Sequence, residues 1–529
     1  MKRRAFVATA AATLALPAVA RPPSGQVFRF IPQTDLAVLD PIWTTAYVTR
    51  NHGYLVFDTL YGQTGPKNGF KATPQMLAGH TMEDDGKTWK LTLRDGLLFH
   101  DGQRVLARDC VASIRRWSAR DALGQALMQR TDEISAPDDR TIQFRLTKPF
   151  ALLPDALGKA ASNMCAIMPE RLASTDPFKQ VTEMVGSGPF RFKADERVSG
   201  SRVVYERFTN YKPREGGGAP EWTSGPKVAH FDRVEWHVIP DPATAAAALQ
   251  QGEVDGWELP LSDLQPLLRR NSRLRIELVY EAGSTMLLRP NHLFPPFDNP
   301  AVRRALLGVI DQTEAMIAVV GTDPSLWRVP CGFFPPGAPM ASDTGMAALD
   351  GKRDYDRAKQ DLQAAGYKGE TVVLLVPTDY PILKAASDVA ASVMRRAGMN
   401  VDDQAADWGT VVQRRASRSP PAQGGWSAFC TSVSGNDLFT PATHTQLRGN
   451  GGQAWFGWPT DATMEALRDQ WFEAADLAGQ QRIASEIQAQ AFANVPYWPL
   501  GSFYNLSAYR GDITGIVHGF PIFWNLQRV

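Results

Sequence analysis

Polar and apolar side chains alternate in short runs along much of this chain. The run from Thr88 to Arg94 has a period of two, which predicts a half-buried strand. Asp-Gly pairs at 95–96 and 101–102 predict turns in a hairpin that follows this strand.

Helical spacing of apolar positions recurs in other stretches. It predicts a helix over 107–118 and another over 354–365, the second ending at Gly366. Residues 463–493 have the pattern of two helices broken near Gly479. Strands that alternate with helices predict mixed α/β layers.

The first twenty residues form a different kind of segment. Three basic residues precede a small, apolar stretch that ends in Ala18-Val19-Ala20, the pattern of a cleavable export signal. Arg3-Arg4 resembles a twin-arginine signal, but ordinary export signals also begin with paired basic residues, so both routes remain open. No later run reaches the roughly 18 apolar residues that span a bilayer, so we expect a soluble, exported protein.

Length and charge narrow the function classes. A chain of 529 residues predicts three or four compact units at roughly 150 residues each. The whole chain has 56 basic and 55 acidic residues; without 1–20 it has 53 and 55, a net charge of −2. This balance gives no indication of a nucleic-acid partner.

Sequence signatures of catalysis or metal binding are not found. The chain has neither a G-x-S-x-G elbow nor an H-E-x-x-H helix, and its eight His residues are dispersed. The four cysteines are also dispersed; one disulfide is conceivable in an oxidising compartment, but Cys110 lies on an apolar helix stripe and fits a buried free thiol. We predict no enzyme activity, no catalytic residue, no metal and no cofactor.

Six segments together resemble one family, the extracellular solute-binding proteins of family 5, which are the oligopeptide- and dipeptide-binding components of ABC importers. They span nearly the whole chain after the signal: LDPIWTTAYVTRNHGYLVFDTLYG (39–62), PQMLAGHTMEDDGKTWKLTLRDGLLFHDGQRVLARDCVASIRRW (74–117), VGSGPFRF (185–192), ALQQGEVDGWE (248–258), PPFDNPAVRRALLGVID (295–311) and YDRAKQDLQAAGY (355–367).

Most of these motifs are scaffold. His100 is expected to be a hydrogen-bonded structural residue. Asn299 is a candidate helix cap before Pro300, and Arg303 and Arg304 are expected to form a basic helix face.

The resemblance implies a two-lobed periplasmic-binding-protein clamshell, type II-like and of cluster C, with an extra domain inserted in the first lobe. It predicts a first lobe of 26–62, 185–285 and 500–529, an inserted domain of 63–184 and a second lobe of 286–499. The chain would cross between the lobes near 285 and 500, at hinges whose closure buries a ligand. The implied partners are the ligand and an ABC permease and ATPase complex at the inner membrane, with the protein itself a monomer.

In peptide-binding members of the family, an Asp of the second lobe pairs with the free ammonium of the ligand. Alignment places Gly435 at that position here, with Asp437 two residues further on. A buried ammonium without a carboxylate partner is costly, so either Asp437 substitutes or the solute is not an ordinary peptide. Asp437 also fits a solvated turn or a helix cap.

Aromatic residues are further candidates for the cleft. Trp408 falls where the family has a cleft Trp, and flat rings offer broad packing and cation–π attraction, although each could equally lie in a core. Arg414 and Arg415 could hold a ligand carboxylate or form a solvated turn. The predicted ligand-binding residues are Trp43, Trp257, Tyr280, Trp408, Arg414, Trp426, Thr431, Ser432, Asp437, Trp455 and Trp498.

Two function classes remain. The first is an exported binding protein that captures a peptide or peptide-like solute, or a different solute such as a metal chelate, opine or sugar, because one fold hosts many ligands. The second is an exported enzyme or chaperone on the same clamshell.

Overall fold

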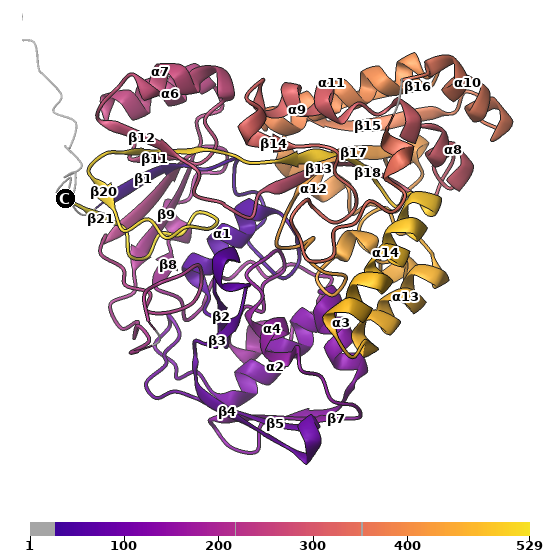
Figure 1. Cartoon of the computed structure of the whole chain (residues 1–529). Coiled ribbons are helices and arrows are strands. Elements are labelled where there is room, and N and C mark those ends of the chain that lie inside the picture. Colours follow the sequence, from indigo (N-terminus) through magenta and orange to yellow (C-terminus); the bar gives the residue numbers. More distant parts are fainter. Residues whose placement is uncertain (1–26, 217, 351–352) are drawn as a thin grey trace, which may run out of the picture.

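The computed structural model describes residues 27–216, 218–350 and 353–529 and contains three main sheets (Figure 1). The predicted export signal at 1–20 lies outside these residues. None of the described helices combines the length and the apolar character needed to cross a membrane.

A seven-stranded sheet gathers strands from three distant parts of the chain. Its spatial order is β12 (Leu274–Glu277), β19 (Ser507–Arg510), β11 (Gly256–Trp257), β1 (Val27–Ile31), β10 (Arg233–His237), β9 (Arg202–Arg207) and β8 (Phe190–Phe192). β1 is parallel to both β10 and β11, and four of its five side chains are buried, as its continuous apolar run requires of a central strand. The helices of this part are α1 (Tyr47–Val56), α6 (Pro242–Gln251) and α7 (Gln265–Arg269).

A six-stranded sheet forms the second large part. Its order is β14 (Trp327–Arg328), β18 (Trp498–Phe503), β13 (Ser284–Pro290), β17 (Ala428–Ser434), β15 (Thr371–Pro377) and β16 (Asn400–Ala406). β13 is antiparallel to both of its neighbours. The helices here are α8 (Pro300–Ala305), α9 (Gln312–Val320), α10 (Tyr355–Ala364), α11 (Pro381–Arg396), α12 (Trp408–Arg414), α13 (Ala462–Glu473) and α14 (Leu477–Asn494).

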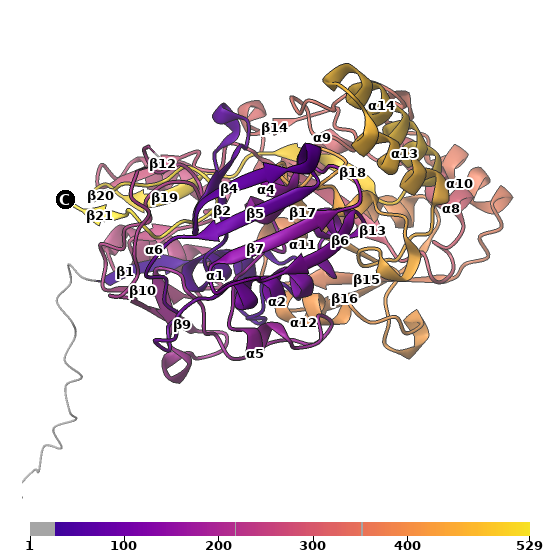
Figure 2. The ribbon, with the colours of Figure 1, turned by 90° about the horizontal axis from the view of Figure 1, so that it is seen from below.

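A four-stranded antiparallel sheet lies at the bottom of Figure 1 and crosses the view in Figure 2. Its order is β4 (Leu77–Glu83), β5 (Thr88–Leu93), β7 (Thr141–Leu146) and β6 (Thr131–Ser135), accompanied by α2 (Ala107–Ser118), α3 (Ala122–Gln129), α4 (Leu153–Gly158) and α5 (Glu170–Ala173). β5 confirms the strand predicted from alternation, because Trp89, Leu91 and Leu93 are buried on one face. Two small hairpins complete the strands: β2 (Tyr61–Gln63) with β3 (Ala72–Pro74), and β20 (Ile513–Thr514) with β21 (Gln527–Arg528).

The helix predictions are confirmed, with one shifted boundary. The helix over 107–118 is α2, and the one over 354–365 is α10, with Asp354 as its cap. The break between the last two helices lies at 474–476 and not at Gly479. Gly479 sits in the first turn of α14, where its N–H donates to the capping carboxylate of Asp476 at 2.8 Å.

The predicted cap of α8 is confirmed, but the predicted basic face of this helix is wrong for Arg303. Asn299 does cap α8, accepting from the N–H of Ala301 at 2.9 Å. Arg303, expected on a basic helix face, is instead buried, and its Nε donates to the carbonyl of Asn494 at 3.0 Å, at the end of α14. Helix ends carry carbonyls without intrahelical donors, so a buried cation satisfies them there. Arg304 is exposed.

The four cysteines and His100 lie in the protein interior. All four cysteines are buried and free, which confirms the free thiol expected at Cys110 and shows no disulfide. Burial raises the pKa of Cys331 and of Cys430 to about 12, so both thiols stay protonated. His100 is hydrogen-bonded through Nε2 to the carbonyl of Gly188 at 3.0 Å, as expected.

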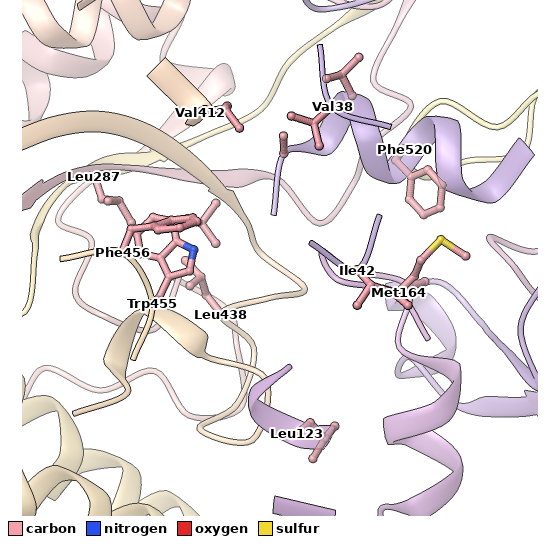
Figure 3. Close-up of a cluster of buried hydrophobic side chains, with 14 of the residues drawn as sticks. Val38, Ile42, Leu123, Met164, Leu287, Val412, Leu438, Trp455, Phe456 and Phe520 are labelled. Atoms are coloured by element: carbon pink, nitrogen blue, oxygen red, sulfur yellow. The ribbon is translucent and has the colours of Figure 1, made fainter. Parts of the chain in front are cut away.

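The two large sheets are joined by two short crossings, residues 278–283 between β12 and β13 and residues 504–506 between β18 and β19. Buried apolar side chains from the different parts gather at their junction, with Trp455 and Phe456 near Leu287 and Leu438, and Ile42 near Met164 (Figure 3). The limits predicted for the lobes and the inserted domain stay predictions.

Candidate ligand-binding cleft

A cavity of about 580 Å³ lies where the three parts of the structure meet. Its walls come from the segment before α1, from the α2–α3 region and residues 163 and 178, and from the loops at 416–418 and 445–458. The lining side chains used below are Trp43, Thr45, Arg120, Gln125, Asn163, Phe178, Arg418, Arg448, Trp455, Phe456 and Trp458.

Aromatic rings form much of the cavity wall. The rings of Trp455 and Phe456 lie 5.5 Å apart, and the indole N–H of Trp43 donates to the carbonyl of Phe178 at 3.0 Å. The indole N–H of Trp455 donates to Thr45 Oγ1 at 3.2 Å, which joins the six-stranded part to the segment before α1. The predicted residues Trp43 and Trp455 therefore lie where a flat solute could pack.

The charged residues that line the cavity are all arginines. Arg448 is paired with Glu465, which lies 2.9 Å away. Arg120 donates to the carbonyl of Trp43 at 2.9 Å and lies over the ring of Phe178. Burial lowers the pKa of Arg120; Asp40 opposes this effect, and the nearby cations, Arg418 among them, add to it.

A smaller pocket of about 20 Å³ adjoins the cavity and shares Thr45 and Trp455 with it. Four predicted residues line this pocket: Trp408, Thr431, Ser432 and the shared Trp455. Its one charged side chain is Arg415, which is 1% exposed and donates to Thr45 Oγ1 at 3.3 Å. Burial lowers the pKa of Arg415 to about 9, and the opposing effect comes from Tyr47.

Asp437 lies at the same junction but faces protein donors. It is 1% exposed, and its carboxylate accepts from Tyr47 Oη at 2.8 Å and from Ser162 Oγ at 2.9 Å. Burial, reinforced by the Asp437 carboxylate, raises the pKa of Tyr47 well above its usual value, so the phenol stays a donor. Asp437 thus connects the loop after β17 to α1 and to the segment after α4.

Gly435 leaves no room for a side chain. A Cβ at this position would lie 2.1 Å from the carbonyl oxygen of Ala282. Its N–H also donates to the carbonyl of Gly283 at 2.9 Å, which fixes the backbone close to the first crossing. An Asp at 435 would therefore require the crossing segment to move.

The model of the bacterial extracellular solute-binding proteins, family 5, matches residues 71–453. The chain belongs to this family. A probable peptide ABC transporter periplasmic-binding protein of Sinorhizobium fredii is 38% identical over 497 residues, which cover 93% of this chain and 92% of that protein. A glutathione-binding protein of Pectobacterium atrosepticum is 26% identical, with coverage of 86% of this chain and 85% of that protein.

Solved structures show the same fold. The agropinic-acid complex of the A. tumefaciens R10 binding protein AgaA has a TM-score of 0.78 at 20% identity, covering 95% of this chain and 99% of that one. The Helicobacter pylori binding protein DppA, solved with the peptide STSA, has a TM-score of 0.75 at 19% identity, covering 95% and 98%. The predicted family and the two-lobed α/β fold are confirmed. We call the part built on the seven-stranded sheet the first lobe and the part built on the six-stranded sheet the second lobe.

Hydrogen bonds across the junction hold the two lobes together. Tyr380 Oη donates to Gln33 Oε1 at 2.7 Å, and Thr34 Oγ1 donates to Asp379 Oδ2 at 3.2 Å. The contacts of Asp437 and Trp455 add to these bonds across the same junction.

Two further predicted residues lie at other small cavities. Trp257 borders a cavity of about 50 Å³ beside residues 238–242. Tyr280 lies on the first crossing, stacks on Trp222 with ring centroids 5.8 Å apart and borders a cavity of about 60 Å³. Glu258 lines the same cavity, and burial raises its pKa to about 7.

Besides Asp437, three predicted residues line none of these cavities. The Arg414 guanidinium donates to the carbonyls of Gly424 and Gly425, at 3.1 and 2.8 Å, and so braces a loop. Trp426 and Trp498 are fully buried core residues.

Sequence reasoning missed the arginines of the main cavity. Arg120, Arg418 and Arg448 lie far apart in the chain and come together only when the lobes and the inserted strands assemble. The one available signal was local: Arg415 and Arg418 are three residues apart, a spacing that puts two cations near one another after α12.

Proposed function

We propose that this protein captures a peptide or peptide-like solute in the cleft between its lobes and delivers it to an ABC permease and ATPase complex at the inner membrane. In this proposal it works in the periplasm, as a monomer, and binds its solute without turnover. The observation that carries the proposal is the cavity of about 580 Å³, because side chains from all three parts of the structure line it.

Closure of the lobes would tell the permease that a solute is bound. A solute that contacts both walls stabilises the closed form through its higher affinity for that form, and the permease can then distinguish loaded from empty protein. The relative at 38% identity, named as a probable peptide transporter component, supports a peptide-like cargo. The ligand-binding residues that we propose are Trp43, Trp408, Arg415, Thr431, Ser432 and Trp455.

A second candidate is a non-peptide solute. It is favoured by Gly435, where the carbonyl of Ala282 leaves no space for a carboxylate that would bind an ammonium. The solved structure of AgaA with agropinic acid supports this candidate, because it holds that compound in the same fold.

Small-angle X-ray scattering and calorimetry test the proposal together. Mature protein is stripped of bound solute by unfolding and refolding, then titrated with the material released from it. We expect one binding event per chain and a smaller radius of gyration on binding. Binding heat without a smaller radius of gyration would contradict closure. The transport role is tested in cells that lack the protein: if the gene for this chain is returned and uptake of the solute is not restored, the transport role is contradicted.

A further inference from the structure

Arginine supplies every charged side chain that lines the main cavity and the pocket beside it. These are Arg120, Arg418 and Arg448 in the cavity and Arg415 in the pocket. No Asp, Glu or Lys lines either space within the described residues. The charged side chains around a solute in the cleft are therefore all positive, which favours a negatively charged solute.

Three of these four cations have no carboxylate within ion-pair distance in the described part of the chain. Arg448 is the exception, because Glu465 neutralises it. Asp40 lies near Arg120 but is paired with Arg116 at 2.7 Å. Arg120, Arg415 and Arg418 donate to backbone carbonyls or to a hydroxyl, which leaves their charge uncompensated.

Arg415 is the most exceptional of the three, because it is almost fully buried. The rings of Trp408 and Phe456 lie 5.3 and 4.8 Å from its guanidinium carbon, and its Nε has no hydrogen-bond partner among the described residues. Aromatic faces offset part of the desolvation of a buried cation but give it no directed hydrogen bond. A planar guanidinium held this way is preorganised for a carboxylate.

The surroundings also disfavour a ligand ammonium. A free ammonium in the cavity would face arginines at every charged position. Asp437, the acidic residue predicted for this role, lines neither space and already accepts from Tyr47 and Ser162. A positively charged group would thus be repelled and left without a carboxylate partner.

We propose that the solute is a peptide-like compound of net negative charge with at least two carboxylates, one held between Arg120 and Arg418 and one reaching Arg415. The two spaces adjoin at Thr45 and Trp455, which line both and are hydrogen-bonded to each other at 3.2 Å, so a carboxylate that reaches Arg415 has to separate this pair and widen the smaller pocket. This inference rests on the proposed function. Its test therefore distinguishes two questions: whether the protein binds a solute, and whether that solute has to be negatively charged.

The test uses three dipeptide probes that differ in charge: N-acetyl-Glu-Glu, its neutral isostere N-acetyl-Gln-Gln amide, and Gln-Gln amide, whose one charge is a free ammonium. Calorimetry with the mature protein should show N-acetyl-Glu-Glu binding at least roughly tenfold more tightly than either other probe, with a preference that weakens as salt is raised.

Two variants locate the effect. Arg120→Gln should weaken binding of N-acetyl-Glu-Glu roughly tenfold to a hundredfold, the loss expected for a charge-assisted hydrogen bond, and leave the neutral probe unchanged. Arg418→Gln changes an exposed residue and repeats the test without a risk to folding. Arg482→Gln, which removes an exposed arginine from an ion pair on α14, is the matched control and should change nothing.

Equal or tighter binding of the neutral or ammonium-bearing probe would overturn the anionic solute and leave the proposed function intact. If none of the three probes binds, the anionic inference fails. If the protein also releases no solute on denaturation, the proposed function fails with it.

Discussion

Asp437 is predicted to hold the lobes closed, and Asp437→Asn tests this role. The carboxylate accepts from Tyr47 Oη at 2.8 Å, from Ser162 Oγ at 2.9 Å and from the N–H of Ser162 at 3.3 Å. Tyr47 belongs to the first lobe and Ser162 to the segment after α4, whereas Asp437 follows the last strand residue of β17 in the second lobe. Opening the lobes would separate these groups.

The cost can be worked out from these contacts. A hydrogen bond to a charged acceptor contributes about 1.5–3 kcal/mol. An Asn side chain has one acceptor oxygen, and its NH₂ group would face a second donor. One of the bonds from Tyr47 Oη and Ser162 Oγ is therefore lost, and the other has an uncharged acceptor. We expect the closed form to lose about 2–4 kcal/mol relative to the open form.

Binding affinity reports this loss. Since about 1.4 kcal/mol corresponds to a factor of ten and the solute binds the closed form, Asp437→Asn should weaken binding at least roughly tenfold. Calorimetry with the co-purifying solute measures the affinity, and X-ray scattering shows whether the variant is more open. Asp354→Asn, which alters the exposed cap of α10 far from the junction, is the control. An affinity within twofold of wild type at unchanged compactness would refute the role of Asp437 as a closure contact.

Three further predictions concern other parts of the molecule. Trp408→Ala should weaken solute binding by roughly 1–3 kcal/mol if the ring packs on the solute, as measured by calorimetry; unchanged affinity would assign the ring to the core alone. Arg303→Ala should lower the free energy of unfolding by roughly 2–4 kcal/mol in urea, because buried carbonyls lose their donor, whereas a comparable loss in exposed Arg304→Ala would contradict this explanation. Burial raises the pKa of Glu258 from its ordinary 4.5 to about 7, so the folded protein binds more protons than the unfolded chain between these values and its stability falls as pH rises through that window, by of order 3 kcal/mol. Urea titrations from pH 4.5 to 8 should show this slope in the wild type and lose it in Glu258→Gln; parallel slopes would disprove the assignment.

Local patterns predicted the elements well. The alternation in β5, the apolar stripe of α2 and the capping residue Asn299 each depend on residues close by in the sequence, so they can be recognised without the fold. Arg303 shows the limit of this reasoning. Its neighbours in sequence suggest a surface helix, but its partner is the end of α14, almost two hundred residues later.

The cleft could be predicted only in part. Trp43, Trp408 and Trp455 could be predicted because the family resemblance places their segments at the border of the cleft. All three line the cavities. Arg415 was weighed beside Arg414, but the choice between them depends on which face of α12 meets the first lobe. That face is decided by tertiary packing, which turns Arg414 to the loop at 424–425 and Arg415 into the junction.

The most direct measurement of the central claim is native mass spectrometry of the mature protein purified from the periplasm, followed by denaturing release of its cargo. The account predicts a complex of one chain with one small solute, and an acidic, peptide-like compound among the released masses. The bare chain alone, unchanged after incubation with the three dipeptide probes, would contradict capture of a solute between the lobes.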